Sequence, residues 1–175
     1  MVFFAGIVFA SCNNDGTTST EVKNDSTVST PDESKSPNYP YTIDHPDNWE
    51  TGSRENTAVA LNALKAFENG DVEKSVEYFG DSVHLLFDGM DVTVAKDSLQ
   101  SMFKSMRASY KNIDIKMLDW ESVISKDKNE EYVTLWYKQT KEDMNGKKDS
   151  VDLVNDLKLK NGKIIQLSEY TRKLH

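Results

Sequence analysis

The chain contains very little cysteine and no long apolar run. Cys12 is the only cysteine among 175 residues, so no disulfide can form within the chain. No group of histidines and cysteines has the spacing of a zinc site. No apolar stretch reaches the roughly 18 to 20 residues that a membrane-spanning helix needs. These absences exclude a disulfide scaffold, a zinc module and a helical membrane span.

Proline is confined to one short segment, and a surplus of basic charge is absent. All four prolines fall between residues 31 and 46. Residues 13–53 carry eight acidic and two basic side chains, whereas residues 54–175 carry 21 acidic and 19 basic ones. The body of the chain is therefore nearly neutral, with the two signs interspersed. Because nucleic-acid binding needs a clustered basic face, we expect no nucleic-acid partner.

An apolar segment, Val2–Ala10, lies directly before the cysteine, and the chain turns polar from Asn13 onward. A short apolar run that ends in small residues is typical of a secretory signal. The order Phe9–Cys12 resembles a bacterial lipobox, in which the cysteine is acylated and holds the protein to a membrane. The resemblance implies lipid attachment at Cys12 in the cell envelope, and Asn13 favours the outer membrane. The alternative is a buried strand or helix with an incidental cysteine.

The segment after the cysteine is too polar to form a core. Residues 13–37 contain only Val22 and Val28 as aliphatic side chains, so their burial cannot offset the entropy lost on ordering. Aromatic residues return in 38–50, which we expect to be an extended lead-in that docks on the domain. The predicted organisation is a signal segment (1–12), a tether with its lead-in (13–50) and one domain (51–175).

Three segments of the domain have apolar residues at helical spacing. The predicted signals for their starts and ends are Asn56 or Thr57, Gly70, Asp71 and Asp97. Between the second and third helices, Val83–Phe87 is predicted to be a short strand that ends in a turn at Asp88 and Gly89.

After the third helix the apolar period changes from 3.6 to 2. The predicted strands are 112–124, 130–141, 149–160 and 163–172. The turn Asn161-Gly162 is a strong hairpin signal, because these residues tolerate positive φ. Helices followed by an antiparallel meander indicate an α+β fold. We predict three N-terminal helices packed on a curved four-stranded sheet plus a short strand, with a conical cavity at one end.

The order of these motifs resembles a known family. Ala66–Asp71 followed by Tyr78–Val83 is similar to the opening of an NTF2-like domain of the SnoaL-like group, and Asn155–Ile165 is similar to its ending. The resemblance spans residues 54–172. The segment Asp47–Gly52 is similar to uncharacterised Bacteroidetes-type envelope lipoproteins. The family implies a cone-shaped fold, a deep pocket and frequent dimers through the sheet, but no single activity.

The ketosteroid isomerase branch of this family provides a test for catalysis. Aligned on that branch, the tyrosine position falls on Ala63, the base on Phe87 and the second acid on Asn155. The isomerase chemistry is therefore not supported. Asp88 and His84 remain as candidate bases, and the alternatives are an ordinary turn for Asp88 and a packing role for His84.

Asn155 is a polar residue in the apolar phase of its strand. A buried amide needs partners, so it makes either a structural hydrogen bond or a contact to a ligand. We expect the pocket to be lined by Phe87, Leu135, Tyr137, Asn155 and Leu157.

The leading hypothesis is a lipid-anchored envelope protein whose domain binds a small, largely apolar molecule. The alternatives are a SnoaL-like enzyme acting by proton transfer and a protein-interaction module whose cone is filled by its own side chains. No cofactor or metal motif is recognised, and we expect a homodimer formed through the sheet.

Overall fold

The computed structural model describes residues 39–45 and 47–174. The predicted lipid-attachment residue Cys12 and the predicted tether 13–37 lie outside this range. Three helices and seven strands lie within it, and none of those helices is long and apolar enough to cross a membrane. In chain order the elements are β1 (Trp49–Thr51), α1 (Arg54–Glu68), α2 (Val72–Glu77), β2 (Phe79–Phe87), β3 (Met90–Ala95), α3 (Lys96–Ala108), β4 (Tyr110–Ser125), β5 (Glu131–Asp143), β6 (Lys148–Lys160) and β7 (Lys163–Lys173).

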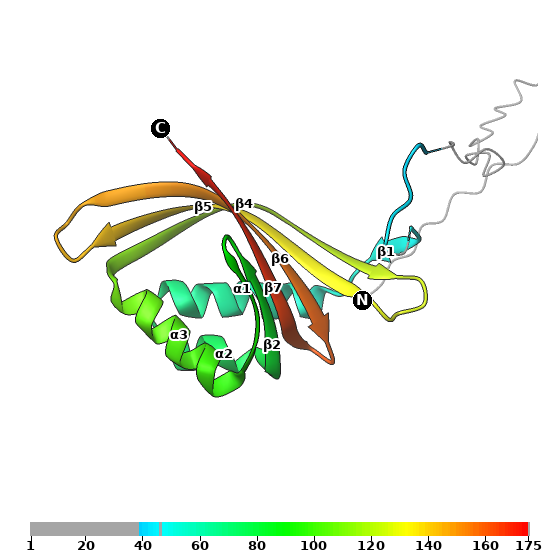
Figure 1. Cartoon of the computed structure of the whole chain (residues 1–175), viewed down its shortest axis with the longest axis horizontal. Helices are drawn as coiled ribbons and strands as arrows, with labels where there is room; N and C mark the ends of the chain where they lie inside the picture. Colours follow the sequence, from blue (N-terminus) through cyan, green and yellow to red (C-terminus); the bar gives the residue numbers. More distant parts are fainter. Residues whose placement is uncertain (1–38, 46, 175) are drawn as a thin grey trace, which may run out of the picture. The chain divides into compact units, whose positions relative to one another are not determined.

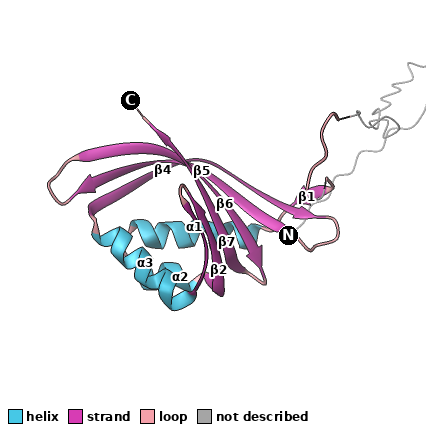
Figure 2. Ribbon diagram, viewed as in Figure 1, coloured by secondary structure: helices cyan, strands magenta, loops and turns pink. Residues whose placement is uncertain are grey.

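All seven strands belong to one sheet in the order β1-β4-β5-β6-β7-β2-β3. Only β2 and β7 run parallel to each other, and every other neighbouring pair is antiparallel. The long strands β4 to β7 bend strongly, and the helices lie on one side of the curved, unclosed sheet (Figures 1 and 2). This is the α+β architecture of an NTF2-like cone.

The prediction of four strands, one short strand and three N-terminal helices was wrong in detail. The turn at Asp88 and Gly89 ends β2 as predicted, but it leads into a further strand, β3, with Phe87 paired to Met90. Helix α3 follows that hairpin, so only α1 and α2 precede β2. The lead-in contributes β1, in which Trp49 pairs with Ser125 of β4.

The helix starts follow from local capping. Ser53 has an extended backbone, and its hydroxyl accepts a hydrogen bond from the Asn56 amide at 2.9 Å, which caps α1 three residues before the predicted Asn56. Asp71 caps α2 as predicted. Helix α3 begins after Ala95, which makes no side-chain cap, rather than after the predicted Asp97.

The hairpin between β6 and β7 turns at Asn161 and Gly162, which both have positive φ. The pairing register then shifts by one residue, because Ile165 is an extra residue in β7. A one-residue shift reverses which side chains face the helices. As a result, Leu167 and Glu169 face the interior beyond the bulge.

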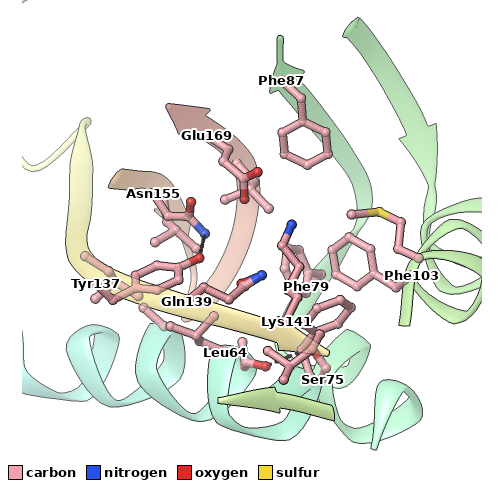
Figure 3. Close-up of a pocket in the computed structure, with 18 of the residues that line it drawn as sticks. Leu64, Ser75, Phe79, Phe87, Phe103, Tyr137, Gln139, Lys141, Asn155 and Glu169 are labelled. Carbon is pink, nitrogen blue, oxygen red and sulfur yellow. Dashed lines mark hydrogen bonds between the residues drawn. The ribbon is translucent and has the colours of Figure 1, made fainter. Parts of the chain in front are cut away.

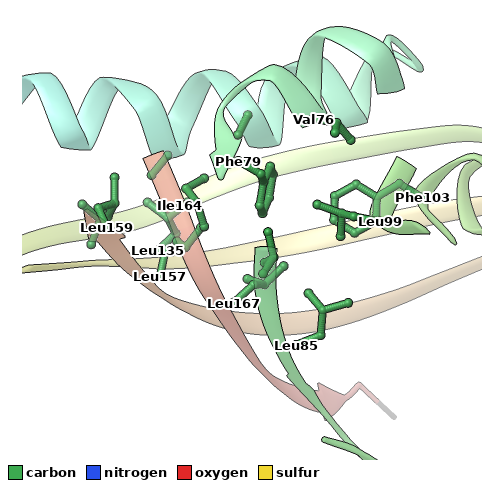
Figure 4. Close-up of a cluster of buried hydrophobic side chains, with 14 of the residues drawn as sticks. Val76, Phe79, Leu85, Leu99, Phe103, Leu135, Leu157, Leu159, Ile164 and Leu167 are labelled. Carbon is green, nitrogen blue, oxygen red and sulfur yellow. The ribbon is translucent and has the colours of Figure 1, made fainter. Parts of the chain in front are cut away.

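The apolar core fills the space between the helices and the sheet (Figure 4). Phe103 of α3 packs edge-on against Phe67 of α1 at 5.4 Å and against Phe79 of β2 at 5.6 Å between ring centroids. Leu99 of α3 and Leu135 of β5 are almost completely buried. This packing closes one part of the cone and leaves the rest for a cavity.

Candidate functional site

A cavity of about 240 Å³ lies between the helices and the concave face of the sheet. Most of its wall is apolar and comes from α1, α3, β5 and β6, through residues such as Ala63, Leu64, Phe67, Phe103, Leu135 and Leu157. Apolar walls with a few placed polar groups are typical of small-molecule sites. The volume suits a small organic molecule.

The structure brings the five predicted pocket residues together. Phe87, Leu135, Tyr137, Asn155 and Leu157 all line this cavity, although they come from three different strands. Tyr137 and Asn155 are buried, and Figure 3 shows both at the sheet side of the cavity.

The two candidate bases lie elsewhere. Asp88 is exposed in the turn between β2 and β3 and does not line the cavity. His84 alternates with the buried Val83 and Leu85, and its Nε2 lies 2.7 Å from Oδ1 of Asp91 on the neighbouring strand. Neither residue is placed to act on a molecule in the cavity.

Asn155 and Tyr137 form a buried polar pair. The Asn155 side-chain amide donates a hydrogen bond to the Tyr137 hydroxyl at 2.9 Å. Burial raises the pKa of Tyr137 well above its usual value, and the carboxyl of Glu169 adds to this effect. Tyr137 therefore stays protonated and keeps a hydrogen to donate.

Glu169 is a cavity residue that was not among the residues predicted from the sequence. It stands opposite Asn155 in the β6–β7 ladder and lines the cavity beside it (Figure 3). Burial raises the pKa of Glu169, and the positive charge of Lys141 opposes that rise only in part. Glu169 therefore holds its proton to a higher pH than an exposed glutamate does.

The side of the sheet that Glu169 faces depends on the bulge at Ile165. Strict alternation from the buried Ile164 places Gln166 and Ser168 inside and Glu169 outside. Ile164 and Ile165 are both apolar, so the sequence allows either phase, and the phase that begins at Ile165 places Leu167 and Glu169 on one face. Only the bulge turns Glu169 inward.

Lys141 and Gln139 add to the polar part of the wall, which also includes Tyr110, Ser75 and Ser109. Gln139 is buried, and the Lys141 ammonium lies 5.2 Å from the centre of the Tyr110 ring, where a cation is attracted to the aromatic face. Among residues 39–45 and 47–174, no group of three or more histidine, cysteine or acidic side chains is arranged to hold a metal ion. The site therefore combines apolar walls with one carboxyl group, one ammonium group, two phenols, two amides and two serine hydroxyls.

No family model and no curated protein matches the chain. Its fold, however, is shared by many solved structures. AusH from Aspergillus nidulans has a TM-score of 0.57 and 19% identity, and the match covers 71% of this chain and 88% of AusH. An LEH-like epoxide hydrolase from M. tuberculosis has a TM-score of 0.54 and 13% identity, with 67% and 83% covered.

An NTF2-like protein of unknown function from Exiguobacterium sp. 255-15 has a TM-score of 0.53 and 15% identity, and the match covers 66% of this chain and 99% of that protein. Identities this low establish a common fold and nothing finer. The domain has the NTF2-like fold, with its cavity in the cone that this fold forms.

Proposed function

We propose that the cavity binds a small, largely apolar molecule. The observation that carries this proposal is the apolar cavity of about 240 Å³, whose wall includes the buried, hydrogen-bonded polar pair Tyr137 and Asn155. Burying a polar group costs free energy unless the group is hydrogen-bonded, and Oδ1 of Asn155 has no partner among the described residues, so a polar group of a bound molecule would offset this cost. The open cavity also disfavours an interaction module whose cone is filled by its own side chains.

Native mass spectrometry of the full chain, purified from its own cell envelope, tests this proposal. We expect a mass excess in the native spectrum that disappears on denaturation. The variant Ala63→Leu fills the cavity from α1 and should lose the excess, because Ala63 is buried and lines the cavity.

Ala58→Leu is the matched control, since Ala58 lies on an exposed part of the same helix and does not line the cavity. It should keep the mass excess. No excess in the wild-type protein, or an equal excess in both variants, would contradict ligand binding.

Proton transfer to or from the bound molecule is a second candidate function. It is favoured by Glu169, whose carboxyl lines the cavity and has a pKa raised by burial. One solved structure of the same fold is described as an epoxide hydrolase, which supports a catalytic use of this cone. Glu169 replaces Asp88 and His84 as the candidate base.

Incubation of the protein with its recovered ligand in heavy water tests this second function. If Glu169 exchanges a carbon-bound proton, the ligand gains deuterium, and Glu169→Gln should slow this gain about 100-fold or more. The variant should still show the ligand's mass in the native spectrum. Equal exchange in wild type and variant would argue against the role of Glu169.

We also propose that the domain is tethered to the envelope by a lipid on Cys12. The support is the lipobox-like order Phe9–Cys12 and the polar segment that follows it. Replacement of Cys12 by Ser should move the protein from the membrane fraction to the soluble fraction of the envelope. Membrane association retained in that variant would refute the lipid anchor.

A further inference from the structure

The polar pair in the cavity leaves one hydrogen-bond acceptor unused. Asn155 is 6% exposed, and its Nδ2 group donates to the Tyr137 hydroxyl at 2.9 Å. Its Oδ1 atom is buried and has no hydrogen-bond partner among the described residues. A buried acceptor without a partner is destabilising, so this atom needs a partner that the described residues do not supply, and a group bound in the cavity can provide it.

The same pair leaves one donor unused. The Tyr137 hydroxyl accepts the bond from Asn155, and no acceptor for its own hydrogen is found in the described part of the chain. Tyr137 is 1% exposed and lines the cavity together with Asn155. The cavity wall therefore presents a free O–H donor and a free carbonyl acceptor at one place (Figure 3).

These two groups distinguish between classes of ligand. A ketone, aldehyde or ether oxygen only accepts hydrogen bonds, so it would leave Oδ1 of Asn155 unpaired. An ammonium group only donates, so it would leave the Tyr137 hydrogen unpaired. A hydroxyl group donates to one and accepts from the other at the same time.

Glu169 strengthens this distinction. It faces Asn155 across the β6–β7 ladder and adds further acceptor oxygens to the same part of the wall. A ligand O–H group can donate to Asn155 or to Glu169, because the carboxyl keeps an acceptor oxygen whether it is ionised or protonated.

We propose that the bound molecule carries a hydroxyl group on a largely hydrocarbon body, that is, an alcohol or a phenol, and that Tyr137 and Asn155 recognise this group. The inference rests on the proposed ligand-binding function and names the substrate class for it. It also assigns Asn155 a ligand contact in addition to its bond with Tyr137.

Calorimetric titration of the full chain with four matched probes tests the inference. The probes are 2-naphthol, 2-methoxynaphthalene, 2-naphthaldehyde and naphthalene, which share one apolar body and differ in the polar group. We expect 2-naphthol to bind at least about tenfold more tightly than each of the other three, because only its hydroxyl satisfies both free groups.

A variant at the recognition residue provides a second readout. Asn155→Leu should remove the advantage of 2-naphthol over 2-methoxynaphthalene while naphthalene still binds. Asn145→Leu is the matched control, since Asn145 is exposed in the β5–β6 turn and should leave all four affinities unchanged. If Asn155→Leu does not fold, the probe series with the wild-type protein still decides the question.

The possible results distinguish the recognition of a hydroxyl group from the more general binding of an apolar ligand. If naphthalene binds but the ether or the aldehyde binds as tightly as 2-naphthol, the hydroxyl inference is overturned and ligand binding stands. If none of the four probes binds, both the inference and the proposed function are overturned. A tenfold preference that disappears in Asn155→Leu supports both.

Discussion

Glu169 is a carboxyl group whose environment changes on folding, because the folded chain buries it. Burial raises its pKa in the folded protein above the ordinary value of 4.5, so the folded state binds this proton more tightly than the unfolded state does. The free energy of unfolding therefore decreases as pH rises from the ordinary pKa through the raised one. At neutral pH the Glu169 carboxyl group therefore makes the free energy of unfolding lower than it is at acidic pH.

We predict that Glu169→Gln is more stable than the wild type at pH 7 and that the two proteins converge in stability as the pH falls below the ordinary pKa. Urea denaturation at a series of pH values measures the difference. Glu121→Gln removes an exposed carboxylate from β4 and is the matched control, with no comparable change. A Glu169→Gln curve that runs parallel to the wild-type curve would contradict the assignment.

Tyr137 and Asn155 depend on each other as a pair. Tyr137→Phe removes the oxygen that accepts from Asn155, so a second buried polar atom is left unpaired. We expect this variant to lose about 1–3 kcal/mol of stability. The double variant Tyr137→Phe/Asn155→Leu should lose less, because both partners are then apolar.

Equilibrium denaturation of the two single variants and the double variant measures this coupling. Tyr170→Phe is a suitable control, since Tyr170 is 66% exposed and its hydroxyl is open to water. A double variant that loses as much stability as the two single variants combined would show that the pair acts independently.

At the scale of elements, two helix starts offer a direct comparison. Ser53 and Ala95 have similar extended backbones, with ψ of 144° and 156°, but only Ser53 caps its helix with a side chain. We predict that Ala95→Ser stabilises the protein by about 1 kcal/mol and that Ser53→Ala destabilises it by a similar amount.

Thermal or chemical denaturation of the two variants tests this prediction. Ala58→Ser is the control for the Ala-to-Ser change, because Ala58 is exposed within α1 and offers no free amide to cap. Ala95→Ser without any gain would mean that the α3 start does not accept a side-chain cap.

The elements also show what sequence patterns can predict here. The change from helical to alternating period correctly placed the four long strands, and Asn161 and Gly162 correctly marked a tight hairpin. Strand β3 was missed, although Met90, Val92 and Val94 alternate after the turn. Its side chains are mostly exposed, so packing demands little of them and the apolar signal is weak.

The candidate site was predictable only in part, for a specific physical reason. Residues before the β7 bulge obey simple alternation, and the five predicted pocket residues lie on β2, β5 and β6, where alternation holds. Glu169 lies beyond Ile165, where the register has shifted by one residue. A bulge is set by packing and strand twist as well as by local sequence, so the inward turn of Glu169 required the structure.

At the scale of the whole molecule, the outer face of the sheet carries an aromatic and apolar row. Trp136, Val154 and Tyr170 are cross-strand neighbours on β5, β6 and β7, and the residues flanking Trp136 and Val154 are buried in the interior, so these side chains point outward. The ion pair between Arg172 and Asp152 borders this row. An apolar centre with a charged border is typical of a protein interface.

We propose that two copies of the chain pair through this row, as the expected homodimer requires. Sedimentation velocity should then show a dimer for the wild type and a monomer for Tyr170→Glu at the same concentration. Because Tyr170 is 66% exposed in the single chain, its replacement should leave the circular dichroism spectrum and the stability of the monomer nearly unchanged.

Met144→Glu is the matched control, because Met144 is 69% exposed in the β5–β6 turn, away from the row. It should leave the dimer intact, since it introduces the same negative charge at a comparably exposed apolar site. A dimer that persists in Tyr170→Glu, or a wild type that sediments as a monomer at high concentration, would exclude this face. A glutamate at position 170 cannot be buried between two identical copies without a large desolvation cost. A dimer that persists in this variant therefore uses another face, and the exposed apolar row must contact a different partner.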